Sequence, residues 1–384
     1  MRGFLTFLTI VLASIGIGAA ALDATGNQSI PSLPKITSTA FPYNDQFSSI
    51  ISDGSVLKLF GPTGPQPDRC IYALVATENL HRSRPRTFNC NSPFAELPKS
   101  QLVTAVTSYA NTPRTEVRIA RRNTTSRRVS YGPVVMRFED ASNTHLEQIY
   151  GGGSLWVFDA ATPQGALLLR VSPTTGSVEN RIVVPDQPFR PILAANKDGL
   201  WMEVAVNGGF DYATPSNAPI YHVAPGANSA TVVHRGGRAA LWIAASDHTA
   251  WVDESIFHPG KHGGFSESLL RFEGPKALLV SQKDVTSLAW VTATADLSGD
   301  LWATVIPERH ASSCKGTQDV VRFDSRTGRG AKVALLPQVT VWTSIPYACE
   351  LFGMNTASTF LGGALYVLYD GLSGGYTRLY RIAK

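Results

Sequence analysis

Two short sequence phrases alternate along this chain, and their repetition constrains the fold more than any other feature. The first phrase is an apolar strand with an aromatic residue, entered through Gly or Asp-Gly, and it occurs at Gly153–Asp159, Asp198–Glu203, Gly299–Thr304, Thr249–Asp253 and Gly363–Asp370. The second phrase follows each copy and is an apolar strand with one basic residue: Arg170, His222, Arg271, Arg322 or Arg381. Both phrases recur about every 50 residues, so one supersecondary unit has been copied several times.

The apolar runs are short, rich in Val, Ile, Leu and aromatic residues, and separated by Gly, Pro, Asn, Asp and Ser, which favours strands over helices. A period of about 45 to 50 residues matches a blade of four antiparallel strands, A to D from the axis outward. We therefore predict an all-β fold, a β-propeller of seven four-stranded blades, with six blades, a solenoid or a sandwich array as alternatives. The predicted blades are 44–93, 96–140, 144–185, 189–235, 237–282, 286–338 and 345–384.

The last predicted blade lacks its outer strand, because the chain ends three residues after Arg381. A segment near Ile36–Phe41 could supply that strand and close the ring from the other terminus, which would leave no open sheet edge.

The phrase Asp-Gly-x-Leu-Trp, followed by a strand that contains Arg, resembles the blades of secreted bacterial propellers related to streptogramin lyase, the NHL repeat and the YVTN repeat. The resemblance covers 150–384. It implies a propeller blade, and it leaves the reaction open because function belongs to sites placed on the fold.

The N-terminus carries the three-part pattern of a secretory signal peptide: a basic residue, an apolar run and small residues before Ala21. We predict a signal peptide at 1–21, an exported linker at 22–35 and a single propeller domain at 36–384. The apolar run is too short to span a bilayer, so we expect no transmembrane segment and a secreted or extracytoplasmic protein that is a monomer.

Four cysteines in an exported chain predict two disulfides, and spacing alone permits three connectivities. On the predicted blades, Cys70, Cys90, Cys314 and Cys349 all fall on one rim, where pairing 70 with 90 and 314 with 349 is stereochemically reasonable. The formal charge of +5 is concentrated near Arg114–Arg128, for which a solvated strand face is the simplest interpretation. An exported protein seldom meets nucleic acid, so we expect none as a partner.

In each blade, strand B ends and strand C begins on one rim, which also carries the D-to-A connections. Three consecutive B-to-C connections are predicted to be long, namely Asn207–Ala218, Glu254–Ser266 and Pro307–Gln318, and long loops on a rigid scaffold are often functional. The candidate ligand-binding residues in or beside them are Asp211, Asp253, Glu254, His258, His262, Glu308, Arg309 and His310.

Acidic residues at or near B-strand ends, Asp159, Glu203 and Asp253, are candidate ligands for Ca²⁺ or Mg²⁺, with Asp159 and Glu203 pointing toward the axial opening. Two functions follow. One is a non-catalytic exported propeller that binds a protein, glycan or cell-envelope ligand through the long-loop rim. The alternative is a metal-dependent lyase or lactonase at the axial mouth. No certain cofactor and no catalytic residue emerge, because the sequence has no nucleophile elbow, phosphate loop or dinucleotide fingerprint.

Overall fold

A computed structural model describes most of the repeat region. The described residues are 35–41, 49–52, 56–63, 66–84, 86–89, 94–97, 101–109, 115–123, 129–138, 146–162, 165–184, 191–204, 219–236, 239–258, 264–285, 290–305, 315–340, 357–369 and 377–383. All of them lie within one compact unit, Leu33–Lys384. The predicted signal peptide and nearly all of the predicted linker fall outside these residues, so both stay predictions.

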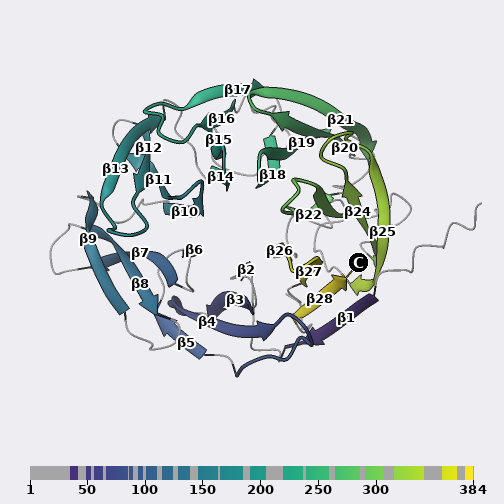
Figure 1. The fold of residues 1–384 in the computed structure, drawn as a ribbon, viewed down its shortest axis with the longest axis horizontal. Helices are drawn as coiled ribbons and strands as arrows, with labels where there is room; N and C mark the ends of the chain where they lie inside the picture. The colour runs from purple at the N-terminus through teal and green to yellow at the C-terminus, as the bar shows by residue number, and fades with distance from the viewer. Residues whose placement is uncertain are drawn as a thin grey trace, which may run out of the picture. The chain divides into compact units, whose positions relative to one another are not determined.

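The described part of the chain is all-β, and its strands form seven four-stranded antiparallel sheets (Figure 1). Three sheets lie in the first half of the chain. The first consists of β2 (Ser49–Ser52), β3 (Val56–Thr63), β4 (Gln66–Ala76) and β5 (Arg86–Asn89), and the second of β6 (Phe94–Leu97), β7 (Gln101–Tyr109), β8 (Thr115–Asn123) and β9 (Val129–Phe138). The third consists of β10 (Leu146–Gly151), β11 (Ser154–Thr162), β12 (Gly165–Val171) and β13 (Val178–Val184).

Three more sheets follow in the same order: β14 (Pro191–Asn196), β15 (Gly199–Val204), β16 (Pro219–Val223) and β17 (Thr231–Arg235); β18 (Ala239–Ser246), β19 (Thr249–His258), β20 (Gly264–Glu273) and β21 (Lys276–Val285); β22 (Trp290–Ala295), β23 (Leu301–Val305), β24 (Lys315–Phe323) and β25 (Gly330–Thr340). The last sheet joins the two ends of the described chain, with β26 (Ala357–Leu361), β27 (Ala364–Tyr369), β28 (Arg378–Ala383) and, beside β28, β1 (Lys35–Ala40). No helix that could span a membrane occurs among the described residues.

The strand registers place the B-to-C connection and the D-to-A connection at the same end of a sheet. In the β14–β17 sheet, Pro191 at the start of the first strand pairs with Val204 at the end of the second. Pro219 at the start of the third strand pairs with Arg235 at the end of the fourth. This common end is called the B-to-C end below, and the end with the A-to-B turn is called the A-to-B end.

Consecutive sheets pack face to face through their second strands, in which successive side chains point to opposite faces. Trp156 and Phe158 of β11 pack with Leu200 and Met202 of β15 in one apolar cluster. Trp201, Trp251, Trp302 and Tyr366 make the same kind of contact with the sheet that follows each of them. The aromatic residue of the repeat therefore packs one sheet against the next.

The two phrases of the repeat meet in the structure as a cross-strand pair. The aromatic residue of the second strand lies directly opposite the basic residue of the third strand in five sheets, as Trp156 with Arg170, Trp201 with His222, Trp251 with Arg271, Trp302 with Arg322 and Tyr366 with Arg381. The Arg322 guanidinium carbon lies 5.7 Å from the centre of the Trp302 ring, and the His222 and Trp201 ring centres are 4.4 Å apart. A contact between a guanidinium and an aromatic face is favourable, so the Arg322–Trp302 pair helps to join the second and third strands of its sheet.

Gly299 is required by the A-to-B turn of the β22–β25 sheet. Its φ is +82°, and a Cβ atom would lie 2.6 Å from Oγ1 and 3.0 Å from Cβ of Thr249 in the neighbouring sheet. We expect Gly299→Ala to lower the free energy of unfolding by about 2 to 3 kcal/mol in chemical denaturation, because backbone strain adds to a steric clash. Gly363→Ala is the matched control. Its φ is +75° and open space surrounds the added methyl, so only the strain of about 1 kcal/mol is expected. Equal losses would contradict the contact with Thr249.

Candidate functional site

Polar side chains replace apolar ones at one repeated position in three consecutive sheets. The position lies two residues after the aromatic residue of the second strand, and it holds Glu203, Asp253 and Thr304, which we call the polar sector. All three are buried, with 2%, 0% and 1% of their surface exposed. The flanking sheets carry Phe158 and Leu368 there, both fully buried. Because burying a polar group costs free energy that an apolar residue would not, the fold gains nothing from this sector, and such departures from the pattern concentrate at functional sites.

Glu203 lies between the β14–β17 and β18–β21 sheets, near the B-to-C end. Its Oε2 atom accepts a hydrogen bond of 2.8 Å from the backbone N–H of Ala240, while Oε1 has no hydrogen-bond partner. Burial raises the pKa of Glu203 to about 8; the bond from Ala240 acts in the opposite direction, and the nearby Glu254 carboxylate adds to the rise. Glu203 is therefore a carboxylic acid held in its neutral form over most of the physiological range.

Glu254 and His234 complete this interface. His234 Nε2 lies 3.1 Å from Glu254 Oε1, but it is not aligned with that oxygen for a hydrogen bond. The backbone at Gly236 passes directly over both groups, since a Cβ atom there would lie 2.6 Å from each Glu254 carboxylate oxygen and 2.7 Å from His234 Nε2. Only glycine lets the D-to-A connection pass so close to the carboxylate.

Asp253 faces the opposite direction, toward the β22–β25 sheet. The alternation of β19 places it on the face of Trp251, which packs with Leu301, Ala303 and Val305. Neither carboxylate oxygen of Asp253 has a hydrogen-bond partner. Burial, then the carboxylates of Glu267 and Glu254, raise the pKa of Asp253 well above its usual value. A buried carboxyl group without a donor at either oxygen is rare in native structures and calls for a functional reason.

The third interface, between the β22–β25 sheet and the last sheet, carries neutral polar groups. Thr304 lies on the face of β23 that packs against β27, and the Tyr369 hydroxyl of that strand donates a hydrogen bond to Gln318 Oε1. Burial raises the pKa of the Tyr369 phenol, and the Thr304 hydroxyl beside it acts in the opposite direction. Acidic character is thus confined to the first two interfaces of the polar sector.

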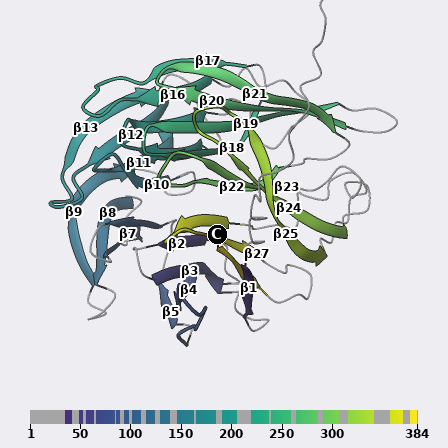
Figure 2. The same cartoon turned by 45° about the vertical axis from the view of Figure 1, so that its right-hand side comes forward.

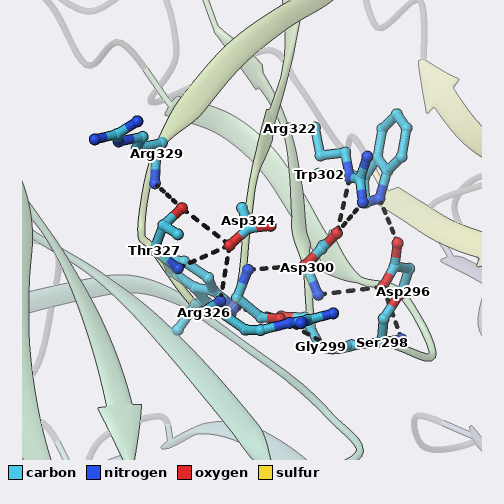
Figure 3. A network of polar contacts seen from close by, with 12 residues as sticks. Asp296, Ser298, Gly299, Asp300, Trp302, Arg322, Asp324, Arg326, Thr327 and Arg329 are labelled. Atoms are coloured by element: carbon cyan, nitrogen blue, oxygen red, sulfur yellow. Dashed lines mark hydrogen bonds and ion pairs between the residues drawn. The ribbon is translucent and has the colours of Figure 1, made fainter.

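Carboxylates at the A-to-B end are treated differently by the same fold (Figure 3). Asp296 Oδ1 accepts hydrogen bonds from the backbone N–H groups of Ser298 and Asp300 at 2.9 and 3.1 Å, and Oδ2 accepts one of 2.9 Å from Trp302 Nε1. Asp296 is 3% exposed. Both of its oxygens are therefore fully used to hold the A-to-B turn against the aromatic residue of the repeat.

Asp300 and Asp324 are used in the same way. Asp300 Oδ2 accepts hydrogen bonds from Nε, at 2.8 Å, and Nη2 of Arg322, and Oδ1 accepts one of 2.7 Å from the Ser325 backbone N–H (Figure 3). Burial alone would raise the pKa of Asp300, but these bonds lower it on balance. Asp324 Oδ1 accepts the backbone N–H groups of Arg326 and Thr327. Both oxygens of the buried Asp296 and Asp300 thus accept hydrogen bonds, whereas only one oxygen of Glu203 and neither oxygen of Asp253 does.

Several residues predicted to form the site lie outside the described part of the chain. These are Asp211, His262, Glu308, Arg309, His310, Cys90, Cys314 and Cys349. Only the strand position is known for three others: Asp159 lies in β11, His258 ends β19, and Cys70 lies in β4 opposite Phe88. The disulfides and the loop residues therefore stay predictions.

The predicted B-to-C connection Glu254–Ser266 is longer than the connection in the structure. Strands β19 and β20 continue pairing as far as His258 and Gly264, and Figure 2 shows them as long neighbouring strands. The run Ser255-Ile256-Phe257 extends the strand because β-branched and aromatic residues suit it. Glu254 is consequently a buried strand residue, 3% exposed, rather than the first residue of a loop, and Asp253 beside it is fully buried. Gln318 likewise lies within β24.

Two of the three proposed metal ligands, Glu203 and Asp253, face different interfaces, and the side chain of the third, Asp159, lies outside the described part of the structure. Glu203 was expected at an axial opening, but it is buried between two sheets, and Asp253 faces the next interface. No group of three or more His, Cys, Asp or Glu side chains that could hold a metal ion occurs among the described residues. Glu203 and Asp253 thus do not fit one Ca²⁺ or Mg²⁺ site, which needs about six oxygen ligands.

Residues that sequence reasoning missed include His234, Glu267, Gln318 and Tyr369, which border the polar sector. His234 is the penultimate residue of β17 and lies beside Glu254 of the neighbouring sheet, a contact with no local sequence signal. The polar sector itself does have a sequence signal. The residues two positions after each repeated aromatic residue are Phe, Glu, Asp, Thr and Leu. The polar run in the middle was visible without the structure.

Comparisons with known proteins support the fold. The β-propeller domain of the Trilobed protease from Pyrococcus furiosus has a TM-score of 0.52 at 9% identity, over 91% of this chain and 95% of that one. Kuenenia stuttgartiensis hydrazine synthase has a TM-score of 0.51 at 12% identity, over 88% and 96%. No protein-family model and no curated protein matches the sequence. The chain has a β-propeller fold, and identities this low show the fold alone.

Proposed function

We propose that this protein is an exported, non-catalytic β-propeller of seven blades, with β1 as the outer strand of the last blade, that binds a protein, glycan or cell-envelope ligand. The binding region is the B-to-C end of the sheets that carry the polar sector. The predicted export rests on the N-terminal signal pattern.

One observation carries this proposal: buried polar residues occupy a position that Phe158 and Leu368 fill elsewhere in the same fold. Two of the three substituted sheets, β14–β17 and β22–β25, also keep the long B-to-C connections predicted from the sequence, between Val204 and Pro219 and between Val305 and Lys315. Rigid strands that present polar groups beneath long loops are a common arrangement of binding sites.

Asp253→Leu tests whether the polar sector serves function rather than stability. We expect the free energy of unfolding at pH 7 to rise by about 1 to 3 kcal/mol, because an unpartnered buried carboxyl group is replaced by a residue that the last blade tolerates. The measurement is chemical denaturation. Binding of the labelled protein to cell envelopes of the producing organism should fall at least tenfold.

Asp253→Asn serves as the second variant, since it removes the ionisable group and adds little volume. A loss of stability in both variants, with envelope binding unchanged in Asp253→Asn, would show that Asp253 supports the fold and would contradict the proposal.

A further inference from the structure

We infer that the polar sector binds an organic cation, with its ammonium or guanidinium groups donating to the unoccupied oxygens of Glu203 and Asp253. The inference rests on the proposed binding function and names the chemistry of its ligand.

The two interfaces present hydrogen-bond acceptors that lack donors. Asp253 is fully buried and has no donor at Oδ1 or Oδ2, and Glu203 is 2% exposed with no donor at Oε1. By contrast, Asp296 and Asp300 at the A-to-B end, each 3% exposed, have donors at both oxygens. The same fold thus satisfies both oxygens of these carboxylates but leaves one oxygen of Glu203 and both oxygens of Asp253 without a donor.

The charges also select a cation. Each of the two carboxyl groups lies close enough to Glu254 for repulsion between negative charges, and Glu267 adds to it at Asp253. Two other charged or titratable groups face these carboxyl groups from neighbouring strands. His234 lies beside Glu254, and Asp319 of β24 lies on the face toward Asp253, where it forms an ion pair with Lys332 at 2.7 Å. Four carboxyl groups in two adjacent interfaces favour a positively charged ligand that relieves their repulsion.

The number of acceptors favours an organic cation over a metal ion. An ammonium group has three donors and a guanidinium five, so the open oxygens suffice for one or two such groups. Calcium would need six to eight oxygen ligands, and the described residues contain no cluster of three metal-ligating side chains.

The proposed ligand site lies near the B-to-C end of the β18–β21 sheet. Strand β18 starts at Ala239, opposite Ser255, and β19 and β20 continue pairing beyond it to His258 and Gly264. Asp253 lies just inside the point where the first strand begins.

The test measures binding of fluorescently labelled tri-lysine by anisotropy at fixed ionic strength, at pH 5.5 and 8.5. We expect it to bind at least tenfold more tightly than its acetylated, uncharged counterpart. Affinity should rise with pH, because the cation binds the ionised carboxylates and displaces their protons. The double variant Glu203→Gln/Asp253→Asn should lose at least tenfold in affinity. Asp247→Asn is the matched control: it removes one negative charge at the A-to-B end and should change affinity less than twofold.

Two further measurements use spermidine as a competitor for binding and Ca²⁺ as an additive in thermal unfolding. Competition by spermidine alone would assign the cation to a free polyamine, and competition by tri-lysine alone to a basic peptide; either supports the inference. No binding of either, or equal binding by the double variant, would overturn it. So would a Ca²⁺-induced rise in melting temperature that only the wild type shows. Envelope binding that is lost in Asp253→Leu, without any binding of tri-lysine or spermidine, would overturn the cation and leave the proposed function standing.

Discussion

Replacing Glu203 by Gln is expected to make the protein markedly more stable at pH 9 and to leave its stability near pH 4 unchanged. The pKa of Glu203 is raised from 4.5 to about 8 in the folded protein. Between these values unfolding releases a proton, so the wild type loses stability as the pH rises, by about 1.4 kcal/mol per pH unit. The loss is complete above the folded pKa and amounts to about 4 to 5 kcal/mol. Gln cannot ionise and still accepts the bond from Ala240, so it avoids this loss.

Urea denaturation at pH 4, 6, 7.5 and 9 measures the effect. The difference between the variant and the wild type should grow steadily with pH and level off above pH 8. Asp247→Asn provides the control, because Lys197 lowers the pKa of the Asp247 carboxyl through a hydrogen bond. Its substitution should lower stability above about pH 4, the opposite direction. A constant difference for Glu203→Gln across the series would show that Glu203 ionises normally.

The second large effect is expected at the A-to-B end, where Asp300→Asn should destabilise the protein by about 3 kcal/mol. Asp300 binds Arg322 through two nitrogens and the Ser325 backbone through one. An amide nitrogen in place of Oδ2 would face the Arg322 donors, leave that guanidinium without its partner, and loosen its contact with Trp302. Thermal and chemical unfolding report the loss directly.

Asp324→Asn is the comparison for this prediction. Asp324 accepts two backbone N–H groups and the Thr327 hydroxyl through one oxygen, Oδ1. Asn keeps a carbonyl oxygen there, and it is as good a residue for such a turn, so the loss should be much smaller. Comparable losses for both variants would indicate that the ion pair with Arg322 contributes little.

The sequence predicted the repeating unit well because its signal is local. Leu155-Trp156-Val157 and its copies place an aromatic residue in a short apolar strand, and the following basic residue marks the next strand. Six predicted blade ranges enclose the observed sheets to within a few residues. The predicted Glu254–Ser266 loop was wrong because Ile256 and Phe257 continue the strand, and strand ends are set by pairing across the sheet rather than by composition.

The site depended on information that no single strand contains. By itself the sequence determined the all-β repeat and the positions of its aromatic residues, because both follow from spacing within one strand. Only the tertiary structure decided that Glu203 meets Glu254 and His234 while Asp253 faces the next sheet with no donor. The reason is physical: alternate side chains of one strand point to opposite faces, and the groups that satisfy or repel them come from sheets formed by distant parts of the chain.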